Sequence, residues 1–586
     1  MAVENLITEH IDIWTSAVKT KSTSGRGSSK KFELYGVKKL RELILELAVR
    51  GKLVPQDPSD EPASVLLERI AEEKKRLVKD KLIPRTKGLP PINEDEIPID
   101  LPNGWTVVRL GELTSKLGSG STPRGGKNAY TSEGIPFLRS QNVRNEGIKL
   151  DDIAYISEEI HQKMENTKVL PGDVLLNITG ASLGRSTIFP SNLVEANVSQ
   201  HVTIIRLIES QMNQFIHLGI LSPLVQQLVW GRQVGMAIEG LSKKVLEMFE
   251  FPIPPIAEQH RIVAKVDELM ALCDQLEQQT EASIEAHQVL VTTLLDTLTN
   301  SADAYELMQN WARISEHFDT LFTTEESIDQ LKQTILQLAV MGKLVPQDPS
   351  DEPAAELLKR IAEEKAQLVK EKKIKKEKAL PPITEDEKPF ELPSGWEWCR
   401  LPDLGELARG KSKHRPRNDP KLYENGNIPL VQTGDVARAN GTILTYTAKY
   451  NEFGLAQSQL WPKGTLCITI AANIADTATL GFDACFPDSV VGYTPYDKEI
   501  PTVYFDYFIK TAKENLERFA PSTAQKNINL EILSNVLVPC PPMQQFPRIV
   551  KKVNLLLGIC DELKERLKES QMSQLQLTDA IVEQAV

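Results

Sequence analysis

Residues 405–412 match the nucleotide-binding pattern GxxxxGK[ST], in which the last two letters are Lys411 and Ser412. In a working P-loop a strand precedes the pattern and a helix begins at the Lys-Ser pair, so that backbone amides surround a phosphate. Here Pro416 and Pro420 follow closely, and proline cannot donate the hydrogen bond that a helix interior needs. The pattern therefore keeps a nucleotide-driven enzyme only as an alternative hypothesis.

Other residue types that support catalysis occur without the spacing they need. The eight histidines form no HExxH pattern and no pair four residues apart, as a metal-binding helix requires. The six cysteines include no CxxC pair, so neither a zinc site nor a disulfide framework is indicated. We find no catalytic-triad signature and no glycine-rich cofactor fingerprint. The sequence therefore predicts no catalytic residue, metal or cofactor in this chain.

Positive charges gather in two segments that are also rich in hydroxyl and amide side chains. Arginine with Gln or Asn suits contact with base edges, and lysine with Ser or Thr suits contact with phosphates. An ordinary solvated surface is the alternative, and the net charge of −12 counts weakly against nucleic acid. The predicted DNA-binding residues are Lys116, Ser119, Ser121, Thr122, Arg124, Lys127, Arg139, Gln141, Asn142, Arg144 and Arg185 in the first segment, and Arg409, Lys411, Lys413, His414, Arg415, Arg417 and Gln432 in the second.

An internal repeat organises the chain. Residues 51–63 recur without a change as residues 342–354. The sequences then diverge, and similarity returns where Arg261-Ile262-Val263 matches Arg548-Ile549-Val550. Similar ends around dissimilar middles indicate a common frame that carries two different recognition domains.

The repeated segments, 33–83 and 325–374, should present the same surface twice and bind two copies of one partner. The alternative is that they pack only within the chain. A weaker match relates the last seven residues, 580–586, to residues 334–340. It predicts a pseudo-cyclic arrangement in which the end of the chain lies beside its first repeat.

The elements that would position these residues follow from periodicity and length. A chain of 586 residues exceeds a single core. Helical spacing is found at 37–50, 63–81, 210–229 and 503–519, and β-like runs at 169–176, 202–207 and 466–470. Two long proline-poor stretches, beginning near 257 and 548, carry apolar stripes that pair most simply with each other.

The sequence thus predicts an α/β (α+β) fold with two recognition domains, two long antiparallel helices and a pseudo-twofold repeat. The expected divisions are 1–102 (first repeat and linker), 103–256 (first recognition domain), 257–300 (central helix), 301–393 (second repeat and linker), 394–543 (second recognition domain) and 544–586 (C-terminal helix). No apolar run approaches the roughly 18 residues of a membrane span. The first residues do not resemble a signal peptide, so a cytoplasmic protein is expected.

Four motifs occur along the first predicted domain: Gly104-Trp105 with Arg109-Leu110, then residues 170–175, 196–201 and 251–263. Together they resemble the specificity (S, or HsdS) subunits of type I restriction–modification systems, and the first of them resembles the start of that family's recognition domain. Residues 170–175 and 196–201 resemble its central strand and its Asn/Gln-His stretch, and residues 251–263 are the strongest match. The identical repeats resemble the subgroup with extended repeats.

This resemblance implies a subunit that catalyses nothing itself. It implies recognition of a bipartite, asymmetric double-stranded DNA target, one half per domain, in a complex with two modification subunits and two restriction subunits. S-adenosylmethionine, ATP and Mg are then expected on those partner subunits. A coiled-coil adaptor without DNA recognition is the further alternative.

Overall fold

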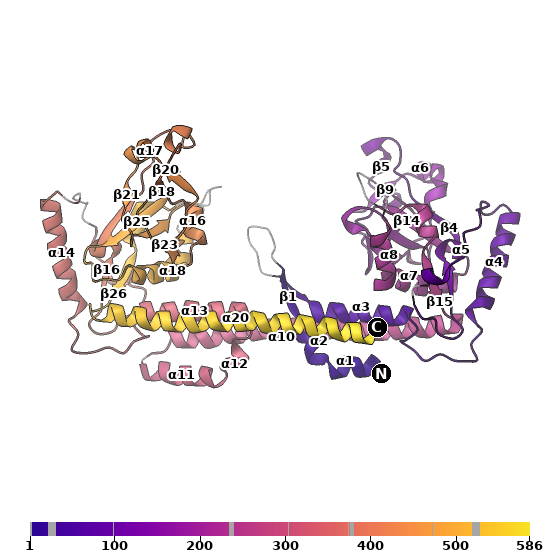
Figure 1. Cartoon of the computed structure of the whole chain (residues 1–586), viewed down its shortest axis with the longest axis horizontal. Helices are drawn as coiled ribbons and strands as arrows, with labels where there is room; N and C mark the ends of the chain where they lie inside the picture. The colour runs from indigo at the N-terminus through magenta and orange to yellow at the C-terminus, as the bar shows by residue number, and fades with distance from the viewer. Residues whose placement is uncertain are drawn as a thin grey trace. The chain divides into compact units, whose positions relative to one another are not determined.

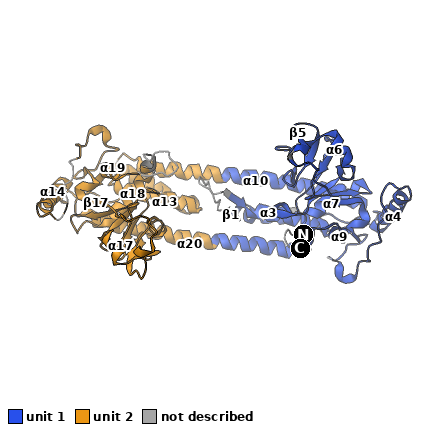
Figure 2. Cartoon of the chain, turned by 90° about the horizontal axis from the view of Figure 1, so that it is seen from above, with its two compact units in different colours: residues 1–283, 570–586 blue, residues 284–569 orange. Residues whose placement is uncertain are grey.

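The computed structural model describes residues 3–21, 31–97, 99–233, 240–302, 304–372, 374, 380–471, 473–518 and 528–586. The chain divides into two compact units. Unit 1 contains residues 1–283 and 570–586, and unit 2 contains residues 284–569, as Figure 2 shows.

Unit 1 consists of a helical head followed by a domain of short strands (Figure 1). The head contains α1 (Val3–Glu9), α2 (Ile11–Ser16), β1 (Val18–Lys21), β2 (Lys31–Leu34), α3 (Tyr35–Val49) and α4 (Ala63–Lys79). The domain contains β3 (Thr106–Arg109), α5 (Leu110–Leu113), β4 (Thr114–Ser119), β5 (Tyr130–Thr131), β6 (Ile135–Leu138), β9 (Ala154–Ile156), α6 (Glu158–Lys163), β10 (Lys168–Val169), β11 (Val174–Asn177), β12 (Ser186–Ile188), β13 (Ala196–Val198), β14 (Val202–Leu207), α7 (Asn213–Leu221), α8 (Pro223–Gly231), α9 (Lys243–Glu247) and β15 (Glu250–Ile253).

Unit 2 repeats this plan. Its head contains α11 (Ala304–Glu316), α12 (Phe318–Leu321), α13 (Glu325–Val340) and α14 (Ala354–Lys370). Its domain contains β16 (Glu397–Arg400), α15 (Leu401–Leu404), β17 (Gly405–Arg409), β18 (Ile428–Leu430), α16 (Thr433–Arg438), β19 (Thr442–Ile443), β20 (Ala448–Tyr450), α17 (Glu452–Ala456), β21 (Leu460–Trp461), β22 (Leu466–Thr469), β23 (Thr477–Leu480), β24 (Ala484–Cys485), β25 (Val490–Pro495), α18 (Thr502–Arg518), α19 (Leu530–Asn535) and β26 (Leu537–Cys540).

The two domains share one sheet order, apart from one added strand in each, β5 in unit 1 and β19 in unit 2, although their sequences are dissimilar. In unit 1 the sheets run β12-β11-β14-β4 and β10-β13-β6-β9-β5. In unit 2 they run β23-β22-β25-β17, with β19 added beside β23, and β21-β24-β18-β20. Each second sheet contains one parallel pair, β6 with β13 and β18 with β24. The dissimilar middles therefore share one scaffold.

Two of the predicted elements are interrupted in the structure. The run at 169–176 is not one strand, because a turn at Gly172 (φ 88°) separates β10 from β11. The helix expected at 210–229 is broken, since the Ser222 hydroxyl accepts from the Val225 amide and caps a new helix that begins at Pro223.

The identical repeat segments adopt the same conformation in both units. Gly51 and Gly342 have φ values of 69° and 72°, in the region that favours glycine. An ion pair of 2.6 Å joins Asp60 to Arg261 in unit 1. Its equivalent in unit 2 joins Asp351 to Arg548 at 2.7 Å. Each repeat is thus fixed to the first turns of a long helix.

The long helices are α10 (Ile256–Thr299, 44 residues) and α20 (Gln545–Ala585, 41 residues). Unit 1 contains the start of α10 and the end of α20, and unit 2 contains the reverse, as antiparallel helices require. In unit 2, Leu295 of α10 and Cys560 of α20 share an apolar cluster with Leu331 of α13. The predicted apolar stripe is therefore buried, but the repeat helix shares it.

The predicted pseudo-cyclic arrangement is confirmed within unit 1. The Tyr35 hydroxyl at the start of α3 donates to Asp579 Oδ1 of α20 at 2.7 Å. Burial and this carboxylate raise the pKa of Tyr35 to about 12. The Lys52 ammonium donates to the carbonyl of Val586. Its repeat equivalent, Lys343, donates to the carbonyl of Thr299 at the end of α10 at 2.8 Å.

Candidate nucleic-acid interface

Four loops meet at one edge of the sheets in unit 1. They follow β4, β6 and β11, and the fourth joins β13 to β14. The Ser121 amide donates to the carbonyl of Val198 at 3.1 Å, and the Ile178 amide donates to that of His201 at 3.0 Å. The Asn177 side chain donates to the carbonyl of Ser140 at 2.8 Å. These bonds bring most of the first predicted segment together.

Unit 2 builds the same edge with the same backbone contacts. The Gly410 amide donates to the carbonyl of Val490 at 2.9 Å, as that of Gly120 does to Val202 at 3.0 Å. A Cβ on Gly120 would lie 1.8 Å from a backbone carbonyl oxygen, and one on Gly410 would lie 2.3 Å from another. Both positions therefore require glycine.

This equivalence decides the role of the P-loop-like pattern. Residues 405–409 form strand β17, and no helix is found between residues 410 and 419, all of which the structure describes. Lys411 and Ser412 occupy the positions that Ser121 and Thr122 occupy in unit 1. The pattern is thus the second copy of a recognition-domain loop, and the arrangement needed to surround a phosphate is not formed.

The first segment contains exposed and half-buried side chains. Thr122 donates to Gln200 Oε1 at 3.4 Å, and Gln141 donates to Asp152 Oδ2 at 2.9 Å. Arg139 donates to the carbonyl of Asp152 at 2.7 Å. Exposed members are Ser119, Ser121, Thr122, Arg124 and Gln141, and half-buried members are Arg139, Arg144 and Arg185. The side chain of Lys127 lies outside the described residues.

Two predicted residues serve the domain itself. Asn142 is 1% exposed; its side chain accepts from the Arg139 amide at 3.0 Å and donates to the Lys149 carbonyl at 3.0 Å. Lys116 is half-buried and donates to the carbonyl of Lys168 at 3.1 Å. Burial, with the nearby charge of Arg206, lowers the pKa of Lys116. Both side chains therefore also have a structural role in their own domain, and their contact with DNA stays a prediction.

In unit 2 the arginines converge on one aspartate. Arg417 Nη2 donates to both carboxylate oxygens of Asp488, at 2.7 and 2.8 Å. Arg409 Nε donates to the backbone carbonyl of Asp488, and Arg415 Nη2 lies 3.9 Å from its carboxylate. Spacing could not reveal this residue, which lies 71 positions from Arg417 in the sequence.

The remainder of this loop is held by uncharged and acidic groups. Gln457 Oε1 accepts from the amides of Lys413 and His414, at 2.7 and 3.0 Å. His414 Nε2 is 2.8 Å from Asp419 Oδ2, and this contact lowers the pKa of Asp419. The side chains of Lys411 and Lys413 are exposed. Gln432 is also exposed, on the neighbouring loop before α16.

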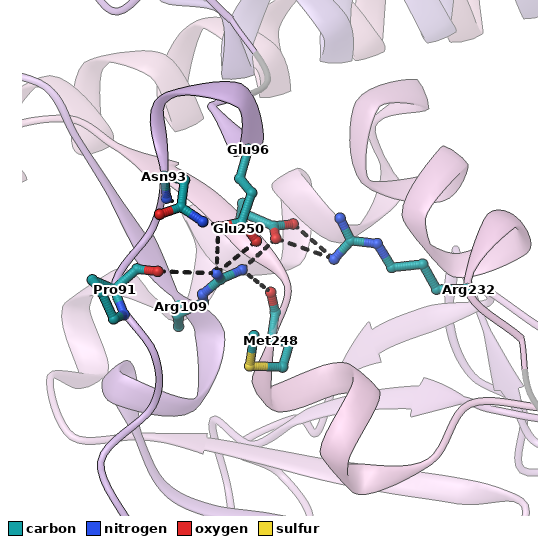
Figure 3. A network of polar contacts seen from close by, with 7 residues as sticks. All are labelled: Pro91, Asn93, Glu96, Arg109, Arg232, Met248 and Glu250. Atoms are coloured by element: carbon teal, nitrogen blue, oxygen red, sulfur yellow. Dashed lines mark hydrogen bonds and ion pairs between the residues drawn. The ribbon is translucent and has the colours of Figure 1, made fainter.

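A buried ion-pair network closes the base of the domain in unit 1 (Figure 3). Arg109 on β3 contacts Glu250 on the paired strand β15 and lies 2.7 Å from Glu96. It also donates to the carbonyl of Met248 at 2.9 Å. Arg232 lies 2.9 Å from the second oxygen of Glu250. The strands at which the chain enters and leaves the domain are therefore joined.

The equivalent network in unit 2 has different members. Arg400 on β16 lies 3.1 Å from Glu387 and donates to the carbonyl of Asn535 at 2.5 Å. The register of β16 with β26 puts Leu537 opposite Arg400, where Glu250 stands opposite Arg109. The buried carboxylate is thus specific to unit 1.

Comparison with known proteins identifies the class to which this architecture belongs. The family model described as the type I restriction modification DNA specificity domain matches residues 102–286 and 393–570. Those ranges contain both sheet domains and the start of each long helix.

The chain belongs to the family of type I restriction enzyme specificity subunits. It is 40% identical over its whole length, and over the whole of each relative, to the EcoEI and EcoAI specificity subunits of Escherichia coli. The crystal structure of the HsdS subunit from Thermoanaerobacter tengcongensis is 19% identical; the superposition covers 84% of this chain and 98% of that chain, with a TM-score of 0.41. No helix among the described residues has the length and hydropathy of a membrane span.

Proposed function

We propose that this chain is the specificity subunit of a type I restriction–modification enzyme and that it binds a bipartite, asymmetric DNA target, one half per domain. One observation carries the proposal: the two domains share a sheet order but differ in side chain at equivalent loop positions. Ser119 corresponds to Arg409, and Ser121 corresponds to Lys411. Equal scaffolds with different contact residues favour two different half-sites.

The chemistry of the loops supports DNA as the ligand. The loop of unit 2 exposes Lys411, Lys413 and Arg417. Cationic side chains neutralise phosphates, and they donate hydrogen bonds to the O6 and N7 acceptors of guanine. The loops of unit 1 offer hydroxyl and amide groups, which suit phosphate oxygens and adenine. In both domains the backbone of these loops is fixed by hydrogen bonds, so DNA binding would cost little conformational entropy of the loops.

We further propose that the repeats seat the partners. The identical loops expose Asp57 and Ser59 in unit 1 and Asp348 and Ser350 in unit 2. Two modification subunits would bind these equivalent surfaces, and two restriction subunits would join that core. Catalysis, with S-adenosylmethionine, ATP and Mg, would belong to the partners, and the complex would act on DNA in the cytoplasm. Among the described residues no cluster of His, Cys, Asp and Glu could hold a metal ion.

Methylation mapping tests the proposal directly. Cells that express this chain with its modification subunit should methylate adenines in a split motif. Exchange of residues 411–417 for another sequence should alter one half of that motif and leave the other half unchanged. A continuous motif, or a motif that survives neutralisation of both loop sets, would contradict the proposal and favour the adaptor alternative. ATP binding by the isolated chain would favour the nucleotide alternative.

A further inference from the structure

Arg417 is held at its guanidinium and at its backbone, while part of its guanidinium stays available. Its Nη2 is shared between the two oxygens of Asp488, and the Tyr423 hydroxyl donates to its backbone carbonyl. Its side chain remains 52% exposed. Its Nε and Nη1 donate no hydrogen bond to the described residues. Arg417 therefore keeps the N–H donors of Nε and Nη1 for a ligand, on a side chain that Asp488 already holds.

The neighbouring arginines are used differently. Arg415 Nη1 donates to the carbonyls of Ser412 at 2.6 Å and of His414 at 2.8 Å, so it closes the loop on itself. Arg409 Nε is occupied by the carbonyl of Asp488. Of the three arginines around Asp488, Arg417 is the one whose guanidinium donates to both carboxylate oxygens while its Nε and Nη1 form no hydrogen bond with the described residues.

We propose that Arg417 recognises a guanine in the half-site bound by unit 2 and that Asp488 is its positioning residue. The N–H donors of an arginine match the O6 and N7 acceptors of guanine in the major groove, which is the commonest specific contact of arginine. Pairing with Asp488 holds the guanidinium in one orientation before DNA arrives, which lowers the entropy lost on binding. This inference rests on the proposed function, since it names the base that one domain recognises.

The equivalent position in unit 1 supports the assignment. Backbone bonds relate residues 199–201 to residues 487–489: Ile178 donates to His201 as Ile470 donates to Ser489, both at 3.0 Å. Asp488 therefore corresponds to Gln200, which accepts from Thr122 in the loop after Gly120. In both domains the residue at this position accepts a hydrogen bond from a side chain of the predicted recognition loop. It is an amide, Gln200, in unit 1 and a carboxylate, Asp488, in unit 2.

A structural ion pair is the competing explanation, and base preference separates the two. If the pair only stabilised the loop, its loss would weaken binding to every sequence in proportion. If it positions a base contact, its loss relaxes one base position and leaves the remaining positions unchanged.

The experiment uses the assembled complex of specificity and modification subunits with a DNA library in which both half-sites are randomised. Arg417→Ala should remove the preference for guanine at one position of one half-site, with a loss of about 5- to 150-fold on the parent target, equivalent to about 1–3 kcal/mol. Arg417→Lys retains the charge but not the planar guanidinium that Asp488 orients, so it should weaken the guanine preference with nearly normal non-specific binding. Asp488→Asn should weaken the preference at the same position.

Controls keep the outcomes separate. Lys463→Ala removes an exposed positive charge from the turn before β22, at the other end of the same sheet, and should leave the motif unchanged. The half-site of unit 1 reports in every variant whether the complex is folded. If the parent selects no sequence from the library, the proposed function fails. If the parent selects a motif that all three variants retain, or if they lose binding uniformly across sequences, this inference alone is overturned.

Discussion

Arg109 and Glu250 provide a test in which the chain supplies its own control. Both side chains are almost fully buried, at 4% and 2% exposed. Arg109→Leu would leave the Glu250 carboxylate buried with Arg232 as its remaining partner in the network, and Glu96 would lose its bond. Breaking a buried pair by removing one partner costs about 3–5 kcal/mol, because the other charge stays out of water.

Glu250→Leu should be much milder. Arg109 would keep Glu96 at 2.7 Å and the Met248 carbonyl at 2.9 Å. That is the arrangement of unit 2, where Leu537 faces an arginine held by Glu387 and a backbone carbonyl. We expect a loss of about 1.5 kcal/mol, the net contribution of the bond to Arg109, because Arg232, 39% exposed, would regain water in place of its bond to Glu250.

Native-state hydrogen exchange of the full chain measures the loss of stability in each variant. Peptides that cover β3 and β15 should open roughly 150- to 5,000-fold more often in Arg109→Leu but only about tenfold more often in Glu250→Leu, since each 1.36 kcal/mol is a factor of ten. Peptides that cover β16 and β26 in unit 2 serve as the internal control and should not change. An effect of Glu250→Leu as large as that of Arg109→Leu would refute the reasoning.

Three further predictions concern binding and assembly. Lys411→Ala and Lys413→Ala should each weaken binding to all DNA sequences and flatten its salt dependence by about one unit; a sequence-dependent loss would contradict this. Four residues inserted after Gln279 in α10 lengthen the helix by about 6 Å, so on variable-gap targets the preferred gap should grow by about two base pairs; an unchanged gap argues against helix length as its determinant. Native mass measurement should find two modification subunits per chain at saturation, and a limit of one would show that the repeats are not equivalent binding surfaces.

The frame of this protein could be predicted from the sequence because its contacts are local or between identical residues. Gly51 and Gly342 terminate matching helices, and the identical aspartates of each repeat meet matching arginines on the long helices. Helical periodicity likewise identified α3, α4 and α18 to within two residues, since an apolar face at 3.6-residue spacing is legible without a partner.

The recognition domains could not be predicted at that level. Their strands are two to six residues long, and many different apolar side chains satisfy the same buried strand, so two domains can share a sheet order while their sequences differ. For the same reason the equivalence of Gly120 and Gly410 was hidden, and with it the true role of the P-loop-like pattern. Backbone pairing revealed both.

Charge in the sequence located the recognition loops but did not assign their residues. Composition treats every lysine, arginine and asparagine in a loop alike, whereas burial divides them. Lys116 and Asn142 form hydrogen bonds with backbone carbonyls and amides of their own domain. Asp488, far along the chain from Arg417, became its partner only when β24 and β25 brought the two loops together. The sequence by itself determined the repeated frame and the kinds of side chain in each loop. Tertiary packing alone decided which donors and acceptors remain available to a ligand, because those that are buried or already paired inside the fold cannot bind it, whereas the unpaired donors of an exposed side chain can.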